Sequence, residues 1–369
     1  MRELDTATRP MSGFLSPRPL LITARGFEKV SWVASKLPKI IKSGTAELRK
    51  EIESLPLLDT SDVSDPLILR ALLRDYHYLQ SAYARSQPAV QTVPESIAVP
   101  SYTLARRLGR KSMLSYASMV LDNWWQVEPD MPFTFEHVRP IRTFTDTDDE
   151  RGFIVPHTLI EHEARGAVDQ IEPIILDVQG DRASTIIPRL YRISSAFEGM
   201  QTLFAYITKH CDPKVYFEVI RPWMDGFKEA IFEGVDEIGD VPQSFIGPSG
   251  AQSSILPAID AILCIQHDRN YFSAYLEKLR DYMPPEHVRL IERAERSRPL
   301  RAFVIRSSDT DLRQTYCSAV QSVRSFRLVH RAFTKKYISA YSSTARGTGG
   351  SQYDEFVDQY IKDTEAALL

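Results

Sequence analysis

Apolar residues recur every three or four positions along most of the chain, which is the spacing of one face of an α-helix. This pattern covers 65–85, 112–127, 184–211, 215–231, 253–266 and 311–341. The pair Asp65 and Pro66 supplies a typical helix start for the first of these segments. No Asn-Gly or Asp-Gly turn lies between two alternating runs, as a β-hairpin would require. The pattern therefore predicts an all-α protein with many helices of moderate length.

A segment with two prolines, 92–101, is the best candidate for a domain boundary. The section before it is shorter and is interrupted by Leu and Pro, whereas the long apolar helices follow it. We therefore expect a small, mainly helical N-terminal domain over 1–100 and a large helical domain over 101–369.

Composition narrows the class of partner. The chain has 369 residues, 43% of them hydrophobic and 25% charged, with a net charge of −3 and a pI of about 6.3. A strong basic bias, which nucleic-acid binding requires, is absent. The sequence has no apolar run long enough to span a membrane, its first residues lack the apolar core of a signal peptide, and its three cysteines are widely spaced. We expect a cytoplasmic monomer whose partner is a small molecule rather than nucleic acid or a membrane.

One histidine lies on an apolar helical stripe near the C-terminus. Helical spacing places His330 on one face with Val323, Phe326, Phe333 and Tyr337. Glu-x-x-His and His-Glu-x-x-His motifs do not occur, which excludes the common di-iron and zinc sites on helices. A lone histidine of this kind is usually a hydrogen-bonded core residue. The alternative is an axial ligand to a haem iron, which needs one protein nitrogen and a flat apolar cavity.

Arg327 supports the second interpretation, because it precedes His330 by three residues and is its neighbour on the helix surface. A guanidinium at this position could pair with a haem propionate while the imidazole holds the iron. Taken alone, the same arginine could equally be a solvated surface residue.

Several longer motifs, in their order along the chain, resemble the indoleamine 2,3-dioxygenases, haem enzymes that open the indole ring of tryptophan. They are LSYASMVLDNW (114–124), FEVIRPWMDGF (217–227), FIGPSGAQSSILPAID (245–260), LRDYMPPEHVRLI (279–291), SFRLVHRAFTKKYI (325–338) and GTGGS (347–351). The resemblance is specific over most of the chain and loose over 1–90.

The resemblance implies a cofactor site for haem b. It makes His330 the proximal iron ligand and directs Arg327 toward a haem propionate, with Asp260 in the network that supports the proximal side. Ser249 and Gly250 correspond to the tight backbone that passes over the distal face of the haem.

The resemblance also implies a substrate site. Arg221 would receive the substrate carboxylate, a task that suits a bidentate guanidinium. The aromatic residues of the indole pocket and the Gly-rich segment expected to close over the amino-acid end are Tyr116, Phe153, Tyr216, Gly347, Thr348 and Gly349.

Two positions depart from the family pattern. His157 stands where indoleamine-type enzymes usually carry a small residue, and its imidazole could accept a hydrogen bond from the indole N–H. Tyr216 replaces a usual phenylalanine and adds a hydroxyl to an apolar wall. As a plain core or surface residue, either would have no contact with substrate.

The function that the resemblance implies is oxidative cleavage of the indole C2–C3 bond of L-tryptophan by O2, giving N-formylkynurenine. The active form would hold Fe2+, and a reductant would keep the iron ferrous. Two alternatives remain open at this point. One is a haem-dependent oxygenase that acts on a modified indole in secondary metabolism, and the other is a non-catalytic haem-binding protein.

Overall fold

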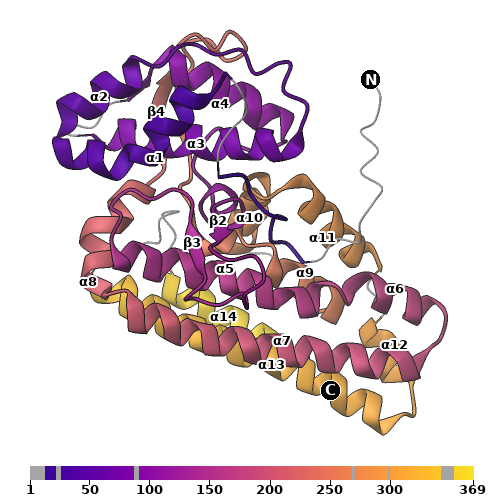
Figure 1. The fold of residues 1–369 in the computed structure, drawn as a ribbon. Coiled ribbons are helices and arrows are strands. Elements are labelled where there is room, and N and C mark those ends of the chain that lie inside the picture. The colour runs from indigo at the N-terminus through magenta and orange to yellow at the C-terminus, as the bar shows by residue number, and fades with distance from the viewer. Residues whose placement is uncertain (1–12, 22–25, 87–90, 268–270, 298–299, 342–352) are drawn as a thin grey trace.

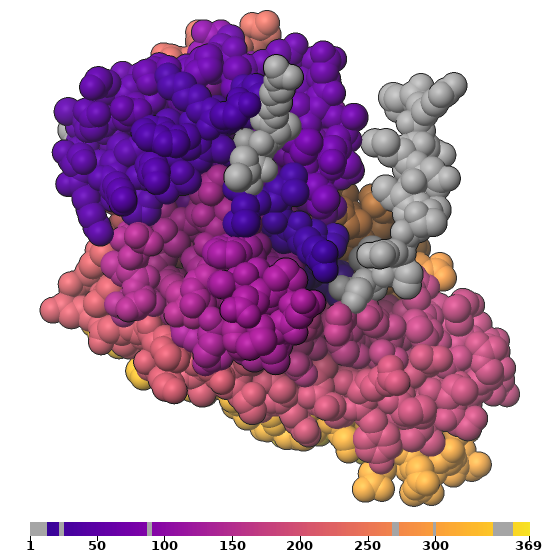
Figure 2. All heavy atoms as spheres, viewed as in Figure 1, coloured from indigo at the N-terminus to yellow at the C-terminus, as the bar shows by residue number. Residues whose placement is uncertain are grey.

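The computed structural model describes residues 13–21, 26–86, 91–267, 271–297, 300–341 and 353–369. Helices dominate these residues, and strands are short and few, which confirms the predicted all-α class. The N-terminal helices form an upper layer that rests on a lower layer of long helices (Figure 1). The space-filling view shows the two layers in contact, with residues from about 300 onward along the lower edge (Figure 2).

Three long helices form the lower layer: α5 (Asp148–Val168), α7 (Ala183–His210) and α13 (Thr310–Tyr337). Side-chain caps begin two of them, because Thr147 accepts from the backbone N–H of Glu150 and Asp309 accepts from that of Leu312. Helix α14 (Tyr353–Ala366) packs against α13. Helices α6 (Ile171–Gln179), α9 (Ile255–Leu263), α10 (Tyr271–Leu279), α11 (Pro285–Ser297) and α12 (Leu300–Arg306) complete this part of the molecule.

The upper layer contains α1 (Glu28–Ser43), α2 (Thr45–Glu53), α3 (Pro66–Arg85) and α4 (Glu95–Arg107). As predicted, Asp65 caps α3 and Pro66 occupies its first turn. A small sheet with strand order β1-β4-β5 joins this layer, and it consists of β1 (Thr92–Val93), β4 (Phe227–Phe232) and β5 (Gln243–Phe245). Since β1 and β4 pair in parallel, the chain returns to the N-terminal layer long after leaving it. The expected domain boundary falls inside α4, so a division at residue 100 stays a prediction.

Buried ion pairs connect the two layers. Asp75 on α3 lies 2.8 Å from Arg142, and Arg110 lies 2.6 Å from Asp122, with all four side chains nearly inaccessible to solvent. Removing one partner of such a pair would leave an uncompensated buried charge, which is strongly destabilising. The Asp75–Arg142 pair fixes α3 against the segment that leads into α5, and the Arg110–Asp122 pair joins the two ends of the segment after α4.

Two segments predicted as continuous helices are interrupted. In 112–127, a π-helical turn at Ala117–Leu121 is followed by strand β2 (Trp124–Gln126), which pairs with β3 (Val138–Pro140). In 215–231, a π-helical turn at Tyr216–Ile220 and a 3₁₀ turn at Arg221–Met224 lead into β4. Short apolar runs do not distinguish buried helix from buried strand, and aromatic residues favour the latter.

Each helix in the described part of the chain is too short or too polar to cross a bilayer.

Close packing of α5 against α7 depends on a glycine. A Cβ atom added at Gly152 would lie 2.1 Å from the carbonyl oxygen of His210. We therefore expect Gly152→Ala to destabilise the protein by about 2 kcal/mol or more, because a main-chain atom cannot move aside cheaply. Urea denaturation measures this change. Gly250→Ala is the control, since a Cβ there meets nothing within 4 Å; equal stability of the two variants would contradict the prediction.

Candidate functional site

Two adjoining cavities lie between the long helices and the loop that precedes α9. The larger has a volume of about 460 Å³, within the range of cofactor and ligand sites, and the smaller about 50 Å³. The same five residues contribute to the walls of both: Tyr116, His157, Ser249, Gly250 and His330. Sequence positions that are far apart therefore meet at one place, and all five are among the predicted site residues.

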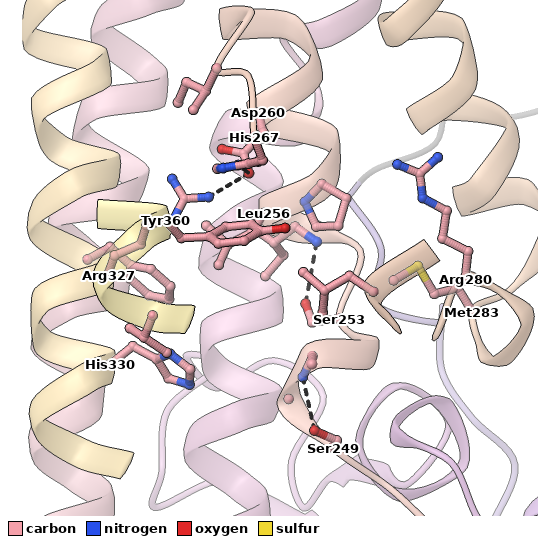
Figure 3. A pocket seen from close by; sticks show the side chains of 18 of the residues that line it. Ser249, Ser253, Leu256, Asp260, His267, Arg280, Met283, Arg327, His330 and Tyr360 are labelled. Atoms are coloured by element: carbon pink, nitrogen blue, oxygen red, sulfur yellow. Dashed lines mark hydrogen bonds and ion pairs between the residues drawn. The ribbon is translucent and has the colours of Figure 1, made fainter. Parts of the chain in front are cut away.

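His330 projects from α13 into the larger cavity (Figure 3). Neither ring nitrogen has a hydrogen-bond partner among the residues that the structure describes, although the ring packs 6.0 Å from that of Phe204. Burial, with smaller contributions from His157 and Arg327, lowers the pKa of His330 to about 4. The imidazole is therefore neutral near pH 7, with a lone pair available to a metal. A hydrogen-bonded core histidine does not fit these observations.

Arg327, one helical turn before His330, is held in a buried ion pair. The residue is 3% exposed, and its Nη2 lies 2.5 Å from Asp260 Oδ2 on α9 (Figure 3). Its Nη1 donates to Thr364 Oγ1 at 2.7 Å. Burial opposes ionisation of Asp260, but the charge of Arg327 and the contact with His267 leave the pKa of this carboxyl below its usual value. The pair joins α13 to α9 and α14. Contact of Arg327 with a propionate stays a prediction.

The loop before α9 forms another part of the cavity wall. Ser249 and Gly250 lie in the loop before α9, and an added Cβ at Gly250 would project into open space. Gln252 fastens this loop, because its side chain accepts from the backbone N–H of Tyr116 at 2.8 Å and donates to the carbonyl of Gly247 at 2.9 Å. These hydrogen bonds hold the loop in place where it lines the same cavity as His330.

His157 on α5 has one defined tautomer. Its Nδ1 lies 2.7 Å from the carbonyl oxygen of Phe153, so Nδ1 carries the hydrogen. Burial lowers the pKa of His157, and the neutral ring therefore leaves Nε2 as a hydrogen-bond acceptor. Phe153 and Tyr216 stack with ring centroids 4.4 Å apart and line the smaller cavity next to it. The predicted aromatic residues are thus together.

Arg221 differs in its position from the predicted site residues that line the cavities. It begins the turn that follows Tyr216, it is half-buried, and its guanidinium lies 5.1 Å from the centre of the Phe217 ring. It is not among the residues that line the two cavities. Its contact with a substrate carboxylate stays a prediction. Gly347, Thr348 and Gly349 lie outside the described residues.

Glu161 was not anticipated. This residue follows His157 by one turn of α5, is 1% exposed, and accepts a hydrogen bond from Ser253 Oγ at 2.7 Å. Burial raises the pKa of Glu161 to about 7, against the opposing effect of the nearby Ser253 and Tyr116 hydroxyl groups. Its spacing from His157 was a usable signal, since positions four apart share a helix face. Phe204 on α7, beside His330, gave no comparable signal.

Comparison with known proteins agrees with this geometry. The family model described as indoleamine 2,3-dioxygenase matches residues 6–367. The chain belongs to the indoleamine 2,3-dioxygenase family. It is therefore an oxidoreductase of the haem-dependent dioxygenase type.

Individual members of the family match along most of their length. The chain is 31% identical to indoleamine 2,3-dioxygenase 1 of Mus musculus and 30% identical to that of Rattus norvegicus, covering 97% of this chain and 93% of each relative. It is 25% identical to a 6-hydroxytryptophan 2,3-dioxygenase of Fusarium equiseti, over 97% of this chain and 95% of the relative.

Because Arg327 neutralises Asp260 in the protein interior, we expect Arg327→Ala to lower the free energy of unfolding of the cofactor-free protein by about 3 kcal/mol. Urea denaturation measures the loss. The matched control is Arg324→Ala on the same helix, whose contact with the exposed Glu365 is 3.6 Å long and should be worth less than about 1 kcal/mol. Similar losses in the two variants would show that the Arg327 ion pair is not a structural constraint.

Proposed function

We propose that this family member binds haem b through His330 and cleaves the indole C2–C3 bond of L-tryptophan with O2, giving N-formylkynurenine. The observation that carries the proposal is the neutral imidazole of His330, which faces a cavity of about 460 Å³ without a hydrogen-bond partner among the described residues. An imidazole in this state is a good axial ligand.

The residues around this cavity fit a flat, largely apolar cofactor with an anionic edge. Side chains on the apolar part of the lining include Ile255, Leu256, Ala261 and Phe326. Arg327 lines the cavity one turn from His330, and although its guanidinium is paired with Asp260, we propose that it also contacts the anionic edge of the cofactor. When bound, haem would supply the iron that activates O2, with Fe2+ as the active state and a separate reductant to maintain it.

The groups that line the smaller cavity suit one edge of an indole ring, and the rest of the ring would extend into the adjoining larger cavity. Tyr116, Phe153 and Tyr216 provide aromatic walls, and Nε2 of His157 is the acceptor that an indole N–H requires. Holding the ring in one orientation beside the cofactor reduces the entropy lost on reaching the transition state. Arg221 and Thr348 would bind the carboxylate and ammonium of the amino acid. His157 would orient the substrate rather than serve as an obligatory base.

A modified indole is the second candidate substrate. Tyr216 is buried in the aromatic wall and adds a phenolic hydroxyl to it, and a fungal relative carries the name 6-hydroxytryptophan 2,3-dioxygenase. A hydroxylated ring would find an extra hydrogen-bond partner there. Turnover of L-tryptophan and 6-hydroxytryptophan in parallel separates the two: a kcat/KM at least tenfold higher for the hydroxylated substrate would favour the second candidate.

Isotope labelling tests the reaction itself. The protein reconstituted with hemin and reduced is given L-tryptophan under ¹⁸O2, and the product is analysed by mass spectrometry. Two labelled oxygen atoms in each product molecule are expected. One atom would contradict the dioxygenase reaction, and absence of turnover with both indoles would contradict the proposed substrate class.

Removing the axial ligand should remove the cofactor. We expect His330→Ala to lose haem during desalting, because the cavity would hold it by packing alone, and the Soret absorbance after reconstitution measures this loss. His137→Ala is the control, since His137 bonds to Thr134 at 3.0 Å and lines neither cavity. Retention of the wild-type Soret spectrum by His330→Ala would exclude His330 as the ligand.

The proposed carboxylate contact has its own kinetic signature. We expect Arg221→Ala to raise KM for L-tryptophan by about 30- to 1,000-fold, corresponding to about 2–4 kcal/mol for truncating one side of a buried charge pair. Haem content should stay at the wild-type level. Arg192→Ala, at an exposed position of α7, should leave KM unchanged. A KM for Arg221→Ala equal to that of the control would remove Arg221 from the substrate site.

A further inference from the structure

Glu161 is a buried carboxyl group behind the wall of the cavity. It lies on α5 one turn after His157 and is not itself part of the lining, but its two neighbours, Tyr116 and Ser253, are. No lysine, arginine or histidine forms an ion pair with Glu161 among the residues that the structure describes. A carboxylate at 1% exposure therefore depends on hydroxyl groups for its stabilisation.

The hydrogen bonds of this carboxyl group are incomplete. Oε1 accepts from Ser253 Oγ, whereas Oε2 has no partner within hydrogen-bonding geometry among the described residues. The Tyr116 hydroxyl lies near enough for Glu161 to raise the pKa of that phenol, in addition to the larger effect of burial. Both hydroxyl groups can rotate, so the direction of their hydrogens depends on whether Glu161 carries a proton.

We propose that Glu161 is a positioning residue that sets the direction of the Ser253 and Tyr116 hydroxyl hydrogens. These hydrogens determine the hydrogen-bonding character of the part of the cavity wall that the two residues form, which we call the distal wall. This inference rests on the proposed function in one respect, namely that the ligand of this cavity binds to a haem held by His330.

The two states of Glu161 present different surfaces to the cavity. As a carboxylate it only accepts, so both hydroxyl groups turn toward it and their lone pairs face the ligand. As a carboxylic acid it donates its hydrogen to one hydroxyl oxygen, and that hydroxyl can then donate into the cavity. No bond to carbon changes, and only the orientation of two O–H groups and the proton of Glu161 differ. The acid form therefore favours a ligand with a negative end.

The titratable groups near Glu161 do not change their charge in the same pH range as Glu161. Burial lowers the pKa of His157, which is on the same helix, and the pKa of His287, which contacts Ser254 from α11. Burial raises that of Tyr116 well above its usual value. All three stay neutral near pH 7, where the pKa of Glu161, about 7, places its change of charge. Of these groups, Glu161 alone changes the wall at neutral pH.

Infrared spectroscopy of the cofactor-free protein tests the titration without haem. The C=O stretching band of a protonated buried carboxyl group should disappear with a midpoint of about pH 7 as the pH is raised. Glu161→Gln should lack this titrating band. Glu163→Gln, two residues along the same helix, should retain it. Absence of the band in the wild-type protein, or its persistence in Glu161→Gln, would overturn the inference.

Carbon monoxide bound to the reduced, hemin-reconstituted protein reports the hydrogen-bonding character of the distal wall. Wild type should show two C–O stretching bands that exchange with the same midpoint, because a hydroxyl donor near the oxygen lowers the frequency. Glu161→Gln should give one set of bands at all pH values, and Ser253→Ala should lose most of the pH dependence. Equal pH dependence in wild type and Glu161→Gln would overturn the inference.

The two arms separate the two proposals. Failure to bind hemin would contradict the proposed function, and the infrared titration would still decide whether Glu161 changes its protonation near neutral pH. If hemin binds and the titration occurs, a single pH-independent C–O band in wild type would overturn the inference and leave the proposed function standing.

Discussion

The ion pair between Arg327 and Asp260 is the constraint on which the site depends. It joins α13 to α9 in the protein interior, and Thr364 brings α14 to the same guanidinium. Since His330 follows Arg327 by one turn of a rigid helix, the ion pair also determines where the imidazole points. A buried charge pair is a poor source of stability compared with apolar packing, but breaking it is costly. The role of the ion pair here is therefore to hold α13 and α9 in position rather than to add stability.

The two sides of the cavity are built by different means. The side of His330 consists of side chains on a long helix, locked by packing and by ionic contacts. The opposite side is a loop whose backbone faces the cavity at Gly250 and which Gln252 fastens to Tyr116. Backbone in contact with a ligand leaves room for a flat molecule, whereas side chains on a helix hold an atom at one point. This division suits a cofactor that is held on one face and used on the other.

The smaller cavity lies where regular helical geometry stops. Both π-helical turns border it, through Met119 in one and Tyr216 in the other, and such turns are frequent at functional sites. The apolar spacing of 112–127 and 215–231 predicted uninterrupted helices. A π-helical turn holds one more residue than an α-helical turn, but this does not change which residues of the segment are apolar. Tyr216, in the second of these turns, packs against Phe153 of α5 and Tyr337 of α13, and those contacts are remote in sequence.

Local pattern by itself determined the helical class, the start of α3, and the unusual position of His330 on an apolar stripe, because each depends on residues within a few turns of one another. The tertiary structure decided what these residues meet. Arg327 finds Asp260 from 67 positions away, and Arg221 lies outside the lining of both cavities despite its place in a specific motif. Glu161 has a pKa of about 7 because the fold removes it from water without an opposing charge. Burial and long-range pairing are properties of the assembled helices, and spacing along the chain does not encode them.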